Sequence, residues 1–388
     1  MDWTSHHMER IPPSGTLKMF ELASRLEAKG KTVYHFEVGQ PDFPTPPHIV
    51  EAANTALSKG LTKYTSSRGI PQLLDAIQNH YATRGIEING RKDVIVTPGA
   101  KMALFKGFLS TLDAGDDVLL LSPAWPTYRV LVRMAGGKPR DVSTLPGYKL
   151  DEEALKCSVN KTVTAIIINS PNNPSGGVLS KDHLKLIFDL ATDYDFVVFS
   201  DEIYESLVYD GIKQSSMLEV DPVMEHTLVI SGFSKAYSMT GWRLGYAIGN
   251  PETIGNMVRI QQNTTSCPTS FVQYAGAVAL ESDQSHITKM REAYEARRNY
   301  MVERFRHIED VECEMPEGAF YAFPDFSAYG LSSNTIAELL LMKAGVSTAS
   351  GSVFGRAFDG YLRFCYAASQ ETIEQGLDSL EAFLPSLR

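Results

Sequence analysis

The residues best suited to covalent chemistry lie in the segment 231–245, which reads Ser-Gly-Phe-Ser-Lys-Ala-Tyr-Ser-Met-Thr-Gly-Trp-Arg-Leu-Gly. Lys235 follows the apolar, strand-like run 227–230, and an amine held at the end of a strand can attack a carbonyl group. Ser234 offers a hydroxyl beside it, and Arg243 offers a planar, permanently charged group that suits a phosphate. An isolated Ser-Lys pair is usually an ordinary surface loop, so the chemical interpretation depends on the rest of the chain.

Apolar runs alternate with helical segments between residues 94 and 262, which predicts βαβ units and a mostly parallel sheet buried on both faces. Ligands of such sheets bind beyond the carboxyl ends of the strands, so the polar residues that follow each run should share one edge. A first strand starts at Val94. The later strands are expected at 117–121, 163–168, 196–199, 227–230 and 244–248, and helices are expected near 16–29, 48–59, 70–84, 102–112, 126–135, 181–193 and 251–262.

Each expected strand is followed by a side chain or turn with a distinct chemical use. Trp125 offers a flat stacking surface, Asn173 an amide, and Asp201 and Tyr204 a carboxylate and a phenol. A helix that begins near Gly99-Ala100 would present unpaired N–H groups and a positive dipole end to an anion. Asp201 could equally be a helix cap. A glycine turn between a strand and a helix, such as the one at Gly99, occurs in every α/β protein.

Pyridoxal phosphate needs an amine for its aldehyde and a carboxylate for its protonated ring nitrogen. Lys235 and Asp201 supply these groups, and Tyr204 could contact the ring hydroxyl. The remaining parts are the Asn173 amide, the Trp125 ring to stack on the cofactor, and Arg243 with the Gly99 turn for the phosphate.

In order and spacing, these residues resemble the class I aminotransferases of the pyridoxal-phosphate fold-type I superfamily. The motifs are Asn173-Pro-Ser-Gly176, Asp201-Glu-Ile-Tyr204, Ser234-Lys235 and Gly241-Trp-Arg-Leu-Gly245. The likeness runs from 38–43 to 361–364, and the prokaryotic aspartate and aromatic aminotransferases are the subgroup that this chain resembles.

The resemblance implies a role for each cofactor residue. Lys235 would bond to the cofactor and move the proton at the substrate Cα, while Asp201 would keep the ring nitrogen protonated. Tyr204 and Asn173 would contact the ring hydroxyl. The phosphate would be held by Gly99, Ala100, Lys101, Ser234 and Arg243, and by Tyr64 of the neighbouring subunit in a homodimer. Where the family often carries a serine, this chain has Gly232, so either Ser231 or Ser234 would take that contact.

The resemblance also implies how the substrate is held. Arg363 would clamp the α-carboxylate, with help from the Gly39 backbone and Asn173, and Trp125 would line the site. An arginine within the apolar run 361–366 in any case needs an anionic partner. Ser14, Thr16 and Lys101 match positions that bind a distal carboxylate in related aspartate enzymes, which favours an acidic amino acid.

The implied architecture is α/β, with a large domain around a mostly parallel seven-stranded sheet and a smaller α+β domain. Residues 1–44 would contribute to the small domain and to an active-site cover, 45–285 would bind the cofactor, and 286–388 would form the small C-terminal domain. Helices are expected there at 284–309, 334–345 and 370–384, with strands near 311–315, 319–323 and 361–366.

Composition excludes several classes of function. The 388 residues are 43% hydrophobic and 21% charged, as in a globular protein, and the net charge of −10 argues against nucleic-acid and acidic-membrane binding. No apolar run approaches the ~18 residues that span a bilayer. The four cysteines lie far apart and the nine histidines are scattered, so no metal is expected and a reducing cytoplasm fits.

The sequence therefore predicts ping-pong amino transfer, with aspartate as the amino donor and 2-oxoglutarate as the 2-oxo acid. An aromatic or broad-specificity aminotransferase and a pyridoxal-phosphate-dependent lyase on the same fold remain alternatives. A non-catalytic cofactor sensor would need an attached helix-turn-helix domain, for which no residues are left. A dehydrogenase is disfavoured because no expected strand is followed by G-x-G-x-x-G.

Overall fold

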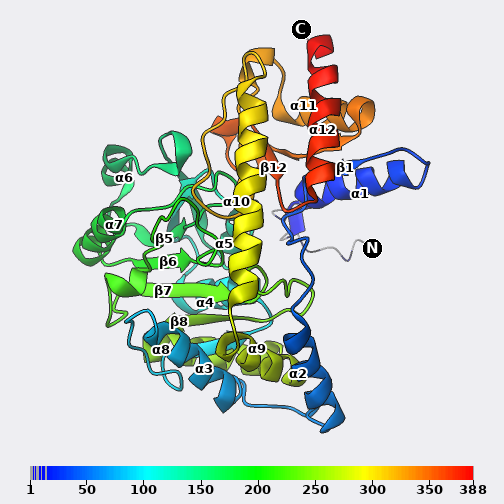
Figure 1. The fold of residues 1–388 in the computed structure, drawn as a ribbon. Coiled ribbons are helices and arrows are strands. Elements are labelled where there is room, and N and C mark those ends of the chain that lie inside the picture. Colours follow the sequence, from blue (N-terminus) through cyan, green and yellow to red (C-terminus); the bar gives the residue numbers. More distant parts are fainter. Residues whose placement is uncertain (1–2, 4, 6–7, 10, 14, 388) are drawn as a thin grey trace.

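The computed structural model describes residues 3, 5, 8, 9, 11–13 and 15–387. A seven-stranded sheet forms the centre of the larger part of the molecule, in the order β2-β8-β7-β6-β5-β3-β4 (Figure 1). All its strands run in one direction except β8, which is antiparallel to both of its neighbours. The prediction of a mostly parallel sheet is confirmed. The strands are β2 (Val94–Thr97), β3 (Asp117–Ser122), β4 (Lys138–Ser143), β5 (Val163–Asn169), β6 (Val197–Asp201), β7 (Thr227–Gly232) and β8 (Gly245–Gly249).

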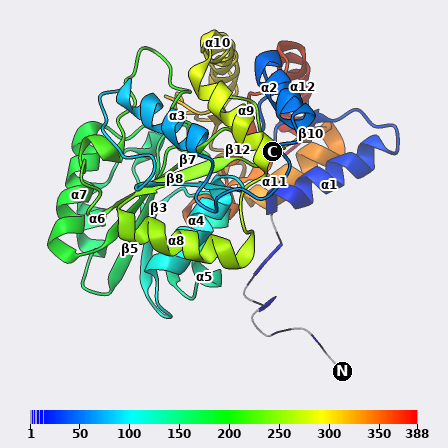
Figure 2. The same cartoon turned by 90° about the horizontal axis from the view of Figure 1, so that it is seen from below.

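Helices cover both faces of this sheet because its central strands are apolar on both sides. In β3, Leu119 and Leu121 enter one hydrophobic core while Val118 and Leu120 enter the other, as the two-residue period of a strand requires. Helices α4, α5 and α8 pack on the second core, and α2, α3, α7 and α9 pack on the first; Figure 2 shows α3 and α8 on opposite sides of the strands. These helices, with α6, are α2 (Pro47–Ser58), α3 (Pro71–Ala82), α4 (Ala100–Thr111), α5 (Pro126–Met134), α6 (Glu152–Ser158), α7 (Lys181–Tyr194), α8 (Pro251–Thr264) and α9 (Ser270–Glu281).

A third core lies in the remaining part of the chain, where a three-stranded sheet of order β11-β12-β9 packs with a separate β1–β10 pair. The pair joins β1 (Tyr34–His35) to β10 (Val346–Ser347) in parallel, which places the N-terminal segment against the C-terminal one. Helix α10 (Ser285–Arg306) extends from the smaller part of the molecule to the level of the seven-stranded sheet (Figure 1). The other elements are α1 (Gly15–Glu27), α11 (Ser333–Leu339), α12 (Gln370–Phe383), β9 (Tyr321–Ala322), β11 (Ala349–Ser350) and β12 (Leu362–Cys365).

The prediction of a strand at 311–315 is wrong. Glu312 forms only an isolated bridge to Asp325. Pro324 beside that bridge has no N–H to donate, and Pro316 ends the segment on the other side, so a ladder cannot extend.

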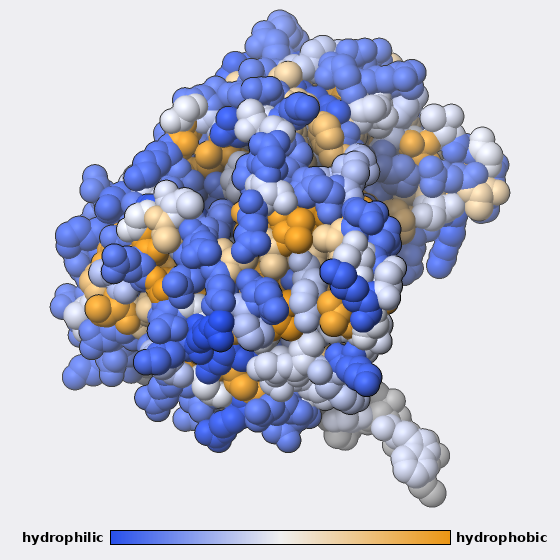
Figure 3. Space-filling model, turned by 60° about the horizontal axis from the view of Figure 1, so that its bottom comes forward, coloured by the Kyte–Doolittle hydropathy of each residue, from blue (hydrophilic) through white to orange (hydrophobic). Residues whose placement is uncertain are grey.

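The surface seen in Figure 3 is mostly hydrophilic, with hydrophobic side chains in small separate groups. Among the described residues, no helix is long and apolar enough to cross a membrane.

Candidate active site

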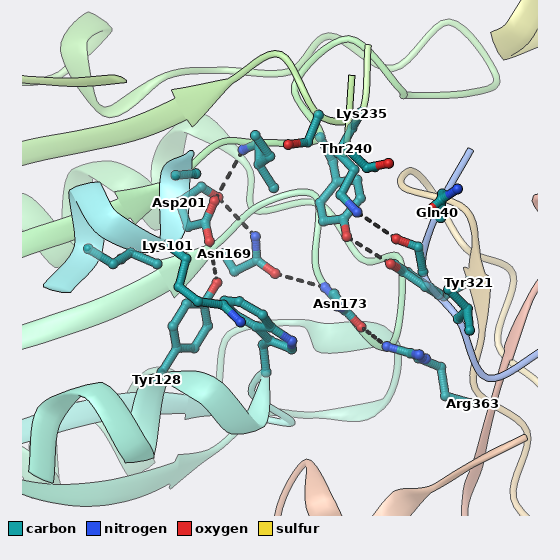
Figure 4. A pocket seen from close by; sticks show the side chains of 18 of the residues that line it. Gln40, Lys101, Tyr128, Asn169, Asn173, Asp201, Lys235, Thr240, Tyr321 and Arg363 are labelled. Carbon is teal, nitrogen blue, oxygen red and sulfur yellow. Dashed lines mark hydrogen bonds between the residues drawn. The ribbon is translucent and has the colours of Figure 1, made fainter. Parts of the chain in front are cut away.

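A pocket of ≈ 550 Å³ opens at the carboxyl edge of the seven-stranded sheet and is closed on its other side by the smaller part of the molecule. Its lining includes Lys235, Asp201 and Asn173 from the sheet edge and Arg363 from the opposite side (Figure 4). Gly39 also lines it. Residues far apart in the sequence therefore meet where the strand order predicts a ligand site. A volume of this size suits a small-molecule site.

Lys235 lies three residues beyond the end of β7. Its Nζ donates a hydrogen bond to the carbonyl oxygen of Gly39 at 2.6 Å and lies 5.5 Å from the centre of the Tyr204 ring. Burial among these groups lowers the pKa of the Lys235 amine to about 8, because removal from water disfavours the charged form. A larger share of this amine is therefore neutral near physiological pH than in an exposed lysine, and the neutral form is the one that acts as a nucleophile.

Asp201 is the last residue of β6 and is buried. The Tyr128 hydroxyl donates to its Oδ2 at 2.6 Å and the Ile203 N–H donates to its Oδ1 at 3.2 Å. Burial raises the pKa of Asp201 to about 6 although both hydrogen bonds oppose the rise. The carboxylate is therefore mostly ionised at neutral pH although it is buried.

A chain of amides joins Asp201 to Arg363 across the pocket (Figure 4). The Asn169 side-chain amide donates to the Asp201 carbonyl oxygen at 2.9 Å, and its own oxygen accepts from the Asn173 N–H at 2.8 Å. Arg363 Nη1 then donates to Asn173 Oδ1 at 3.0 Å. The sheet edge and the opposite wall are thus held in a fixed relation.

Arg363 lies in β12 and is only 3% exposed. Its Nη2 donates to the Glu37 carbonyl oxygen, and its Nε has no hydrogen-bond partner among the described residues. No carboxylate of the described residues forms an ion pair with Arg363. A buried cation with neutral partners and an unpaired donor is costly unless an anion completes it.

The turn before α4 offers a second set of groups that could hold an anion. Gly99 has a φ of 83°, and a Cβ at this position would lie 2.4 Å from Arg243 Nη2, so only glycine lets the guanidinium approach. Gly99 cannot cap the helix with a side chain, which leaves the first N–H groups of α4 to a ligand. Arg243 reaches this edge because β8 is antiparallel and begins at it. Ser234 lines the same pocket.

Ser231, the other serine considered for the phosphate, points elsewhere. Its hydroxyl donates to Glu205 Oε1 at 3.1 Å, and the residue is not part of the pocket lining. Of the two alternatives, Ser234 is therefore the one placed to contact a ligand.

Trp125, Lys101 and Tyr204 complete the walls. Lys101 Nζ lies 5.0 Å from the centre of the Trp125 ring. Burial, and then the nearby Arg243, lower the pKa of Lys101. The Tyr204 hydroxyl forms a 2.8 Å hydrogen bond with the hydroxyl of Tyr321.

Of the predicted site residues whose side chains the structure describes, Tyr64 is not brought to this pocket. Tyr64 is 89% exposed and does not line the pocket of its own chain. Ser14 lies outside the described residues, and Thr16 is in α1 although its side chain is not among those described. Among the described residues there is also no group of His, Cys, Asp and Glu that could hold a metal ion.

Sequence reasoning missed several lining residues. Tyr128 and Asn169 were within reach, since they lie within four residues of Trp125 and Asn173, which were singled out because they follow expected strands. Phe20, Gln40 and Tyr321 line the pocket from the opposite side, where no strand-end rule points to them.

The chain matches the family model for aminotransferase class I and II over residues 31–380. An aspartate aminotransferase of Pyrococcus abyssi is 38% identical, over 98% of each chain. Aromatic-amino-acid aminotransferase 2 of Thermococcus litoralis is also 38% identical over 98% of each chain. The solved structure of the Thermus thermophilus aspartate aminotransferase with maleate superimposes with a TM-score of 0.94 at 37% identity, covering 98% of this chain and 100% of that one.

Proposed function

The chain belongs to the class I and II aminotransferases, and we propose that it transfers an amino group from aspartate to 2-oxoglutarate with pyridoxal 5'-phosphate as cofactor. The observation that carries this proposal is the meeting of a lysine of lowered pKa, a buried carboxylate and an unpaired buried arginine in one pocket. Burial of each of these groups costs free energy, and one reaction, amino transfer, uses all three.

The pocket residues fit the proposed cofactor. Asp201 would face the ring nitrogen, Trp125 would lie against the ring, and the Gly99–Lys101 turn with Arg243 and Ser234 would hold the phosphate. When bound, pyridoxal phosphate supplies an aldehyde that takes up the amino group and an electron-poor ring that stabilises negative charge at the substrate Cα.

The protein's own groups would position the substrate and move its proton. Asp201, ionised above pH about 6, would hold a proton at the ring nitrogen. Arg363 and the Gly39 backbone would fix the α-carboxylate. Because Lys235 Nζ already lies 2.6 Å from the Gly39 carbonyl, a carboxylate held there would leave the Cα proton within reach of this amine. Tyr204 and Asn173 would contact the ring hydroxyl.

The choice of aspartate rests on Lys101, together with Ser14 and Thr16 from the sequence and with relatives named aspartate aminotransferases. Lys101 would meet the distal carboxylate at the Trp125 wall. In an assay with 2-oxoglutarate, Lys101→Met should lower kcat/KM for aspartate by about 10- to 100-fold, the worth of one charge-assisted hydrogen bond, and change that for phenylalanine less than about 3-fold. The control is Lys161→Met, an exposed lysine at the opposite edge of the sheet. An equal loss for both substrates would contradict the assignment.

An aromatic or broad specificity is the second candidate. It is favoured by Phe20, Val38 and Trp125 in the pocket lining and by the relative named an aromatic-amino-acid aminotransferase. Faster conversion of phenylalanine or tyrosine than of aspartate would establish it. A lyase on the same fold would instead release product from aspartate without any 2-oxo acid.

We also propose a homodimer in which Tyr64 reaches the phosphate site of the partner subunit. The support is that this large side chain is 89% exposed and does not line the pocket of its own chain. A cytoplasmic location is proposed from the four cysteines, all of which are free thiols.

The division into domains is likewise a proposal, with 45–285 binding the cofactor and 286–388 forming the smaller domain. Residues 1–44 would join the smaller domain and help to cover the site. The β1–β10 pair and the place of Phe20 in the pocket lining support this assignment.

A further inference from the structure

We propose that Tyr321 is a positioning residue that couples the two halves of the site: its ring supports Arg363 and its hydroxyl orients that of Tyr204. The inference rests on the proposed function, because it concerns the groups that would hold the substrate carboxylate and the cofactor's ring hydroxyl.

The ring of Tyr321 lies directly beneath the arginine. Tyr321 begins β9 and pairs with Cys365 of β12, and Arg363, two residues earlier in β12, points to the same face of the sheet. The guanidinium carbon of Arg363 lies 4.5 Å from the centre of the Tyr321 ring. A cation over an aromatic face is attracted to it, most strongly where water is excluded. The ring therefore fixes the plane in which the arginine presents its unpaired Nε.

The hydroxyl of Tyr321 meets that of Tyr204 at 2.8 Å, with the two rings near perpendicular at 83°. Each phenol has one proton to donate. If Tyr204 gave its proton to Tyr321, it would have none for the cofactor, whereas a proton donated by Tyr321 leaves that of Tyr204 directed into the pocket.

The charges around the two phenols favour the second arrangement. Burial raises the pKa of both phenols and Arg363 lowers it in both, but at Tyr321 the arginine is the largest influence after burial, whereas at Tyr204 the neighbouring Tyr321 outweighs the arginine and raises the pKa further. The phenol beside the cation is the stronger acid and so the better donor. A donated bond also polarises Tyr204 and strengthens the bond that it makes in turn.

Gly39 is the residue that makes room for this hydroxyl. A Cβ at position 39 would lie 2.0 Å from the Tyr321 hydroxyl oxygen, so any side chain there would displace the phenol. The same glycine accepts the hydrogen bond of Lys235. Tyr321 is thus packed against the backbone that contacts the reactive amine.

Two substitutions separate the roles of the ring and the hydroxyl. Tyr321→Phe keeps the ring and removes the hydroxyl, and Tyr321→Leu removes both. The cofactor-loaded proteins are titrated between pH 5 and 10 by visible absorbance, without substrate. The dissociation constant of maleate, an unreactive dicarboxylate, is then measured for each protein. Tyr366→Phe is the matched control, since Tyr366 is buried in the same core and does not line the pocket.

We expect Tyr321→Phe to raise the apparent pKa of the visible band by roughly 0.5 unit, because the ionised ring hydroxyl loses support, and to change the maleate dissociation constant less than about 2-fold. Tyr321→Leu should shift the band similarly and weaken maleate binding by about 5- to 30-fold, through the lost contact with the cation. Gly39→Ala should reproduce the shift of the band without removing the hydroxyl.

A Tyr321→Phe protein that titrates like wild type would overturn the role of the hydroxyl. Wild-type affinity for maleate in Tyr321→Leu would overturn that of the ring; if this variant does not fold, the Tyr321→Phe titration decides the proposal. A wild-type protein that forms no visible band with pyridoxal phosphate would overturn the proposed function itself. Because this result is measured on the wild type, it is distinct from any effect of the two variants.

Discussion

Replacement of Tyr128 by phenylalanine should make cofactor binding sensitive to pH in a range where the wild type is not. The Tyr128 hydroxyl is the closest donor to Asp201, at 2.6 Å, and stabilises its ionised form. A hydrogen bond to a charged group contributes about 1.5–3 kcal/mol, and one pKa unit corresponds to about 1.4 kcal/mol. Loss of this bond should therefore move the pKa of Asp201 from about 6 to roughly 7–8.

The consequence is measurable as a dissociation constant. Only ionised Asp201 pairs with the protonated ring nitrogen, so the cofactor-free protein should lose affinity for pyridoxal phosphate as Asp201 takes up a proton. The ratio of the dissociation constants of Tyr128→Phe and wild type should be near 1 at pH 9 and rise to roughly 5–50 at pH 6. Because both proteins are measured at each pH, the titration of the cofactor's own phosphate cancels in the ratio.

Tyr148→Phe is the control for this experiment. Tyr148 is also a buried tyrosine, but its hydroxyl lies near the Asn169 N–H, at 3.4 Å, and not on the Asp201 carboxylate. The ratio of the dissociation constants of Tyr148→Phe and wild type should therefore not vary with pH. A ratio for Tyr128→Phe that does not vary between pH 5 and 9 would refute the assignment of this hydrogen bond as the support of the ionised carboxylate.

Three further predictions concern the substrate clamp, the N-terminal segment and the subunit contact. Arg363→Lys should raise KM for aspartate by about 10- to 100-fold, measured in steady-state assays, because a point charge cannot replace a two-pronged contact; an unchanged KM would contradict the clamp. Hydrogen bonding to Glu37 raises the pKa of His35 to about 9, so the stabilisation by protonated His35 is complete below pH ~6.5 and disappears as the pH rises through 9. His35→Gln should therefore lower the free energy of unfolding by about 0.5–1 kcal/mol at pH 6 in denaturant titrations, and equal losses at pH 6 and pH 10 would rule this out. Finally, mixed dimers of Lys235→Ala and Tyr64→Ala chains should regain activity that neither parent has, since one of the two sites then carries both residues; no recovery would place Tyr64 outside the partner's site.

The edge of the sheet could be predicted because its rule is local. Asp201, Asn173 and Lys235 each follow a short apolar run, and parallel strands bring such positions together whatever their distance in the chain. The strand 138–143 was missed because it has little apolar character and lies at an edge of the sheet, while the helix 270–281 was missed because it is apolar on nearly all sides and shows little periodicity.

The opposite wall of the pocket follows from tertiary packing, which the sequence does not encode at short range. Arg363 was predicted from the family resemblance, with support from the rule that a charge within an apolar run requires a partner. Tyr321 carries no such signal: its role comes from the pairing of β9 with β12 and from the space beside Gly39. The expected strand at 311–315 failed for a related reason, since its pairing depended on a partner segment that contains a proline.

The covalent partner of Lys235 is the most direct subject for experiment. The purified protein, supplied with pyridoxal phosphate, is reduced with borohydride, digested and mapped by mass spectrometry, and its absorbance is recorded before reduction, with and without aspartate. The account predicts a visible band that aspartate converts to a shorter wavelength, a cofactor-derived mass on Lys235 alone, and neither in Lys235→Ala. A visible band that persists in Lys235→Ala, or a modification found on another lysine, would contradict it.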